Sequence, residues 1–124
     1  MLTLRSHADV QAEHDRAVEQ LEAGPSPALN PRLARHEHAA MSAARDSLAW
    51  VLGYTDTAPW THRVLPNPTA PDVFSEWAKA ETVNHNSALM REDEYRWWYG
   101  SAVEHALSWA RGADTSPPAS PYGY

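Results

Sequence analysis

Four residues of metal-binding types lie on the apolar faces of helices that the sequence predicts. They recur at helical spacing among the alanine, valine and leucine side chains expected to face the core, and they are His14, Glu37, Glu81 and His85. Burying a charge costs several kcal/mol unless the charge is paired or bound to a metal. If these faces converge, two imidazoles and two carboxylates meet, a ligand set that suits zinc, iron or manganese. One interpretation is therefore a metal-binding helical bundle, with metal-dependent hydrolysis as its candidate reaction.

The same residues have a second interpretation that needs no metal. Glu81 and His85 are four residues apart, so on a continuous helix they form a partly exposed ion pair worth at most about half a kcal/mol. If the helix breaks at Asn84, they do not pair at all, and His85 is a loop residue. Glu37 could accept hydrogen bonds from the backbone of the proline-rich strap, residues 54–69, and His14 could lie at the edge of the core. Both interpretations stay open at the level of sequence.

Other catalytic patterns are missing from the sequence. The chain has no cysteine, which excludes a thiolate nucleophile, a thiolate zinc site and disulfides. It has no Gly-x-Ser-x-Gly motif and no glycine-rich phosphate loop, and neither candidate helix carries the Glu-x-x-His motif of di-iron bundles. We therefore expect a protein that is not an enzyme and has no cofactor, unless the metal interpretation holds.

The aromatic residues favour a role in protein interaction. Six tryptophans are many for 124 residues. Trp97 lies off the main apolar stripe of its predicted helix and next to Arg96, while Trp50 lies at the edge of another predicted helix. Tryptophan and arginine are enriched at the centres of protein interfaces. The sequence thus predicts an interface of Trp97, Arg96 and Trp50, used for self-association or a protein partner in an assembly or accessory role. The alternative is that the proline-rich segment covers Trp97.

Helix start signals divide the chain. Ser6 with Asp9, Asn30 before Pro31, and Thr69 before the helical pattern of the third segment are N-cap signals. Helical periodicity follows each, up to Gly24 in the first and Gly53 in the second. A fourth pattern covers 95–110. The boundary between the third and fourth helices stays open between 84–87 and 91–93.

These elements predict an all-α, four-helix bundle-like domain over residues 1–111. A proline-rich strap, 54–69, connects the second and third predicted helices, and we expect it to lie extended over them with Trp60 as its anchor. Residues 112–124 are expected to form a disordered tail.

Charge and hydropathy limit the partners. The net charge is −6, and the nine arginines and one lysine form no basic run, so nucleic-acid binding is not expected. No apolar stretch approaches the length of a membrane helix or a signal peptide. We expect a cytoplasmic protein that binds itself or another protein and not a membrane.

Overall fold

The computed structural model describes residues 3–119, and its regular elements are all helical. The all-α prediction is confirmed. Within the described residues there is no strand, and one isolated β-bridge joins Thr57 to Val64. The elements are α1 (His7–Ala23), α2 (Pro31–Leu52), α3 (Ala70–Glu81), the 3₁₀ helix η1 (Thr82–His85), α4 (Ser87–Glu92) and α5 (Glu94–Ala110).

The predicted helix starts are confirmed by their hydrogen bonds. Ser6 and Asn30 each accept the backbone N–H three residues ahead. Thr69 and Asp72 form a reciprocal capping box, in which each side chain accepts the other residue's backbone N–H. Gly53 ends α2 in the left-handed conformation at φ 82°, where a residue without Cβ is favoured.

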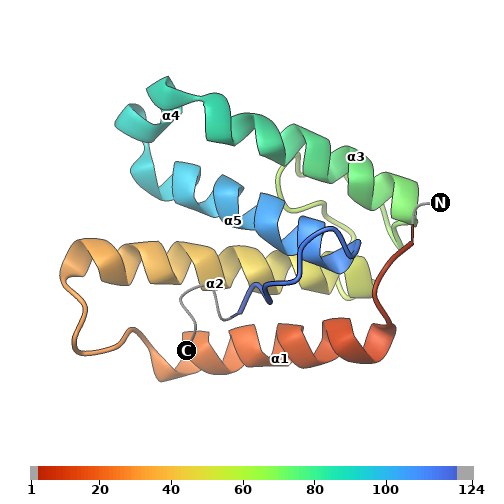
Figure 1. The fold of residues 1–124 in the computed structure, drawn as a ribbon, viewed down its shortest axis with the longest axis horizontal. Coiled ribbons are helices and arrows are strands. Elements are labelled where there is room, and N and C mark those ends of the chain that lie inside the picture. Colours follow the sequence, from red (N-terminus) through yellow and green to blue (C-terminus); the bar gives the residue numbers. More distant parts are fainter. Residues whose placement is uncertain (1–2, 120–124) are drawn as a thin grey trace.

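The helices form a row rather than a closed bundle. In Figure 1, α1 and α2 run antiparallel side by side, α5 lies beside α2, and α3 lies beyond α5. The contacts agree, because α2 packs against both α1 and α5, and α5 packs against α3. Helices α1 and α3 therefore occupy opposite ends of the row. No helix within 3–119 is both long and apolar enough to cross a bilayer.

Both candidate boundaries between the third and fourth predicted helices are used. Helix α3 ends at Glu81, and η1 follows directly. Asn86 then caps the short helix α4 by accepting the N–H of Leu89, and Asp93 caps α5 by accepting the N–H of Arg96. Neither break contains glycine or proline. Side-chain caps alone are enough to redirect the chain here.

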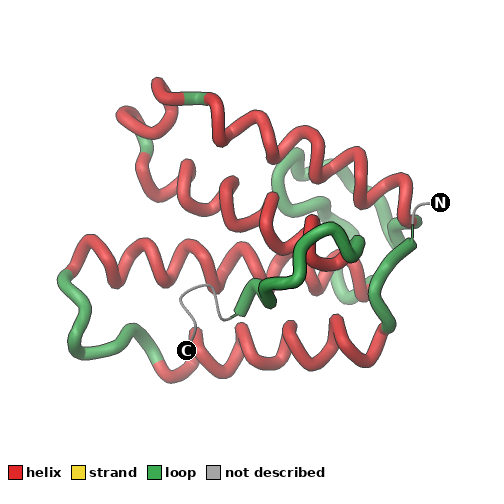
Figure 2. Tube along the Cα trace, in the orientation of Figure 1, coloured by secondary structure: helices red, strands yellow, loops and turns green. Residues whose placement is uncertain are grey.

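The segment that connects α2 to α3, residues 53–69, doubles back on itself and is not an extended strap. Thr57 bridges to Val64, and the N–H of Leu65 donates to the carbonyl of Asp56 at 2.7 Å. The indole N–H of Trp50 donates to the carbonyl of Leu65 at 3.0 Å, which fixes the returning arm to α2. Figure 2 shows this segment as a loop behind α3 and α5.

Part of the predicted tail is packed, and for that part the expectation of disorder is wrong. The guanidinium of Arg5 donates to the carbonyl of Asp114 at 2.7 Å, and His105 bonds the carbonyl of Ser116 at 2.8 Å. Ala119 has no exposed surface. The acceptors in these bonds are backbone carbonyls, which every residue has, so the composition of the segment does not predict them. Residues 120–124 of the predicted tail lie outside the described residues.

Candidate functional site

The four predicted metal ligands do not come together. His14 lies on α1 and hydrogen-bonds Asp15 at 3.1 Å, while Glu81 lies at the end of α3, on the far side of the row. Within residues 3–119, no three histidine, aspartate or glutamate side chains form a group that could hold a metal ion. The predicted four-ligand site is therefore absent from residues 3–119. The helices that carry His14 and Glu37 are neighbours, but Glu81 and His85 lie on α3 and η1, beyond α5.

Glu81 and His85 follow the second interpretation. The imidazole Nε2 lies 3.2 Å from Oε1 of Glu81, although His85 belongs to η1 rather than α3. The His85 side chain is 76% exposed and the Glu81 side chain 37% exposed. At that exposure, solvent screens the pair and it adds little stability.

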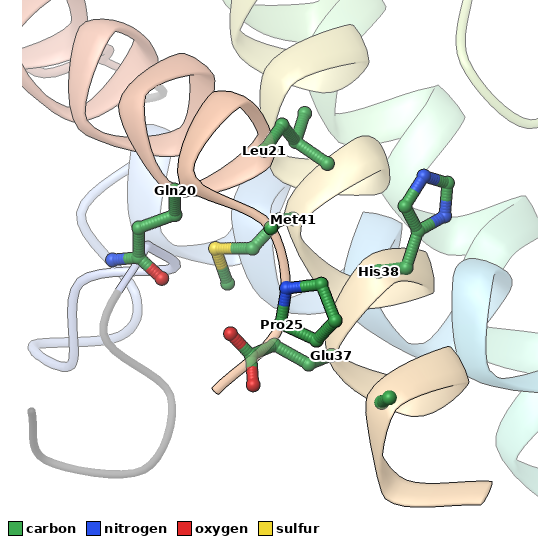
Figure 3. A pocket seen from close by; sticks show the side chains of 8 residues that line it. Gln20, Leu21, Pro25, Glu37, His38 and Met41 are labelled. Atoms are coloured by element: carbon green, nitrogen blue, oxygen red, sulfur yellow. The ribbon is translucent and has the colours of Figure 1, made fainter. Parts of the chain in front are cut away.

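Glu37 lines a pocket too small for an organic ligand. The pocket has a volume of about 20 Å³ and lies between the end of α1, the loop after it and α2. This volume is room for about one water molecule. Glu37 Oε2 is buried and has no hydrogen-bond partner among the described residues. Figure 3 shows the carboxylate beside Pro25, in the loop after α1 and not at the segment 53–69.

A larger groove lies where segment 53–69 meets α1, α2 and α5. Two hollows of about 320 Å³ and 210 Å³ adjoin each other, since they share three lining residues, Pro59, His62 and Tyr99; together they are here called the Arg96 groove. Its remaining lining is mixed aromatic, basic and polar: His14, Arg45, Asp46, Ala49, Thr55, Thr57, Ala58, Trp60, Asp93, Tyr95 and Arg96.

Arg96 and Trp60 form the centre of one half of this groove. The guanidinium carbon of Arg96 lies 4.9 Å from the centre of the Trp60 ring, within cation–π distance. Arg96 is exposed, and no carboxylate in residues 3–119 pairs with it. The groove thus presents an arginine fork that is positioned by an aromatic ring and has its donors free.

Glu76 on α3 holds in place the part of segment 53–69 that carries Trp60. Its side chain is fully buried. Oε2 accepts the backbone N–H groups of Trp60 and Thr61, each at 2.8 Å, and Oε1 accepts the Thr61 hydroxyl at 2.8 Å. The guanidinium of Arg63 lies 3.7 Å from Oε1 and offsets part of the buried charge. A carboxylate bonded in this way fixes the turn that carries Trp60.

Sequence reasoning missed Glu76, although a signal was available. Val73, Glu76 and Ala80 share the buried face of α3, so Glu76 is a charged residue on an apolar stripe. The same criterion singled out Glu37 and Glu81. The apolar stripe predicted for this helix runs through Glu81, whose side chain is 37% exposed, and not through Glu76.

The carboxylates that line the groove are already engaged. Asp46 accepts the Tyr99 hydroxyl at 2.7 Å and the Arg45 Nε–H at 3.0 Å, and Asp93 caps α5. Burial, and then the hydrogen bond to Asp46, raises the pKa of the Tyr99 phenol well above its usual value. Tyr99 therefore stays protonated and acts as a fixed donor to Asp46.

His62 holds an uncommon backbone conformation between the two halves of the groove. Its φ is 62°, in the left-handed region that side chains with a Cβ rarely adopt. The imidazole is exposed, and no hydrogen bond or ion pair to it occurs within residues 3–119. Strained residues of this kind cluster at binding and catalytic sites.

The predicted interface residues separate in the structure. Trp50 is fully buried in the core, so the prediction that it belongs to an interface is wrong for the folded chain. Trp97 is half-buried, and its indole N–H donates to the carbonyl of Val83 in η1 at 3.0 Å. It lines a separate hollow of about 210 Å³ with His36, Ala40, Trp98, Ser101, Ala102 and His105. Of the three predicted interface residues, neither Trp50 nor Trp97 lines the Arg96 groove.

No protein-family model, curated protein or solved structure matches this chain. The chemistry of the groove is therefore the basis for assigning a function.

Proposed function

We propose that the chain is a protein-interaction module whose Arg96 groove binds a carboxylate-bearing, partly apolar segment of another protein. The observation that carries this proposal is the guanidinium of Arg96 on the Trp60 ring, unpaired within residues 3–119, in a groove whose own carboxylates are engaged. The proposed role is accessory: binding, without chemistry on the partner.

The groove offers the contacts that interface centres use. Arginine binds a carboxylate through two parallel N–H donors, and such charge-assisted bonds are about twice as strong as neutral ones. Trp60, Tyr95 and Tyr99 supply apolar surface beside this fork. Large aromatic side chains and arginine contribute most of the binding energy at typical protein interfaces.

The net charge of −6 limits which acidic segments can bind. It repels any acidic partner at long range, but at physiological salt the interaction is largely screened beyond roughly 8 Å. Contact at Arg96 therefore decides binding. A segment that places one carboxylate at Arg96 and an apolar side chain at Trp60 gains both contacts, while a uniformly acidic segment gains mainly repulsion.

The loop half of the groove is preorganised. Glu76 fixes the backbone at Trp60 and Thr61 through buried hydrogen bonds, so the ring under Arg96 is placed before a partner arrives. Fixing a binding surface in advance reduces the entropy lost on association.

The test is selection from a random twelve-residue peptide display library on the immobilised full chain. We expect enrichment of peptides that carry one or two aspartate or glutamate residues next to an aromatic or aliphatic residue. The same selection on Arg96→Glu should lose this enrichment. Arg91→Glu is the matched control, because Arg91 is exposed on α4, does not line the groove and changes the net charge equally. No enrichment, or equal enrichment on both variants, rejects the proposal.

A further inference from the structure

The backbone of Ala119 is held by two side chains of α1. Glu13 Oε2 accepts the N–H of Ala119 at 3.1 Å, and the amide of Gln20 donates to the carbonyl of Ala119. Glu13 and Gln20 are seven residues apart, two helical turns, and so share one face of α1. The Glu13 carboxylate is almost fully buried, and Arg16 pairs with its other oxygen. One acceptor and one donor thus bind the two polar groups of a single residue.

The side chain of Ala119 fills a slot built from small residues. Ala119 is fully buried in a cluster with Ala17, Ala40, Met41 and Ala44, which α1 and α2 supply. Methyl groups form most of the slot. A larger side chain at position 119 has no room there without moving the helices.

We propose that this slot is a peptide-binding site, selective for a segment that presents a small residue at a turn, and that the C-terminal segment 112–119 is its tethered ligand. In the folded chain the segment occupies the site in cis. A free peptide of the same sequence is then the ligand of a chain whose own segment has been prevented from docking.

The packing supports a segment that is separable from the fold. Among residues 3–119, two of the three core clusters contain no residue after Ala110. Side chains from elsewhere reach the segment mainly at its carbonyls, as with Arg5 at Asp114 and His105 at Ser116. In Figure 1 the segment leaves the end of α5 and passes over α2 toward α1, outside the row of helices. Pro117 and Pro118 restrict its unbound conformations and so reduce the entropy lost on docking.

The site is separate from the Arg96 groove. Neither Glu13 nor Gln20 lines that groove, and neither Trp60 nor Arg96 belongs to the alanine cluster. The inference therefore stands or falls independently of the proposed function.

The test uses the full chain with Ala119→Arg, which keeps the slot and prevents its own segment from docking. A fluorescent peptide of residues 112–124 should bind this variant saturably. It should bind the wild-type chain at least tenfold more weakly, because the tethered segment competes at high effective concentration. In the Ala119→Arg chain, Glu13→Ala should abolish binding and Glu13→Gln, which keeps an acceptor, should restore part of it. Glu19→Ala, an exposed position on the same helix, should change nothing.

Several outcomes overturn the inference. If Ala119→Arg loses its helical circular dichroism, the segment is part of the fold rather than a ligand. If the labelled peptide binds both chains equally, or binds the Glu13→Ala chain unchanged, the slot is not its site. Amide hydrogen exchange on the wild-type chain is a second measurement. The Ala119 amide should exchange at least tenfold faster than that of Leu107 in the core, because docking opens locally. Equal rates contradict a separable segment.

Discussion

The six-membered ring of Trp60 lies directly against the backbone of Gly100 on α5. A Cβ atom at position 100 would stand 2.7 Å from Cζ3 of Trp60 and 2.9 Å from Cγ2 of Val83. Contacts between real Cβ atoms and their neighbours do not come this close. The absence of a side chain at residue 100 therefore lets segment 53–69 and η1 approach α5 together, and it sets the depth at which Trp60 sits under Arg96.

Gly100→Ala should destabilise the chain although alanine is the better helix former. The propensity gain is up to about 1 kcal/mol. Overpacking against a rigid ring costs typically 1–3 kcal/mol. We expect a net loss of about 1 kcal/mol in the free energy of unfolding, measured by urea denaturation. In a Trp60→Ala background the same substitution should cost less, since the ring that it strikes is gone. An equal cost in both backgrounds would contradict this packing.

Glu76→Gln should lower the free energy of unfolding by roughly 1–3 kcal/mol, because hydrogen bonds to a buried charged group are strong and leaving one donor unpaired is costly. It should also weaken binding of peptides selected on the Arg96 groove, since the turn at Trp60 loses its anchor. Denaturation and titration calorimetry measure the two effects.

Glu81→Gln is the control on the same helix. Its carboxylate is partly exposed and, within residues 3–119, pairs only with His85, so the free energy of unfolding should change by less than about 0.5 kcal/mol. Equal effects at both positions would refute a special role for Glu76.

Alkaline pH should weaken the fold through Tyr99. The phenol has a raised pKa in the folded chain, whereas in the unfolded chain it titrates near pH 10. Its contribution to stability is therefore complete below about pH 10 and is lost as the pH rises toward the folded value. Tyr99→Phe should show a shallower loss of stability above pH 10 in denaturation series. A slope identical to that of the wild type would show that Tyr99 does not hold its proton through folding.

His62→Gly should leave stability within about 1 kcal/mol of the wild type. Glycine relieves the left-handed strain but increases the entropy of the unfolded chain, and the two effects are of similar size. Peptide binding to the Arg96 groove should nevertheless weaken, because an exposed imidazole is removed from the junction of its two halves. Unchanged affinity would mean that the left-handed conformation of His62 shapes the turn but has no role in peptide binding.

Local signals in the sequence placed the helices well. Ser6, Asn30 and Thr69 start the first three helices through the caps that the sequence predicts, since N-capping depends on residues within one turn. The same locality explains why the boundary between α3 and α5 stayed open. Two adjacent polar stretches both offered caps, and the chain uses both.

Relations between distant residues could not be predicted from helical wheels. The sequence pattern places both His14 and Glu81 on apolar stripes, but Glu81 lies off the buried face of α3, and α5 and α2 separate that helix from α1. The site that the structure reveals depends on Glu76 reaching the backbone of Trp60, 16 residues away across a loop. Because every residue except proline has the same backbone N–H group, the sequence does not show which of these groups a distant carboxylate will bind.

The most direct test of the central claim is a charge exchange at Arg96, measured by titration calorimetry with the best-enriched peptide from the display selection. Arg96→Glu should lower the affinity for the acidic peptide at least tenfold. A peptide with its key carboxylate replaced by lysine should bind the Arg96→Glu chain with most of the lost affinity restored. This pattern places the peptide carboxylate at Arg96. Loss without recovery, or affinity that does not respond to either change, would contradict binding through the Arg96 groove.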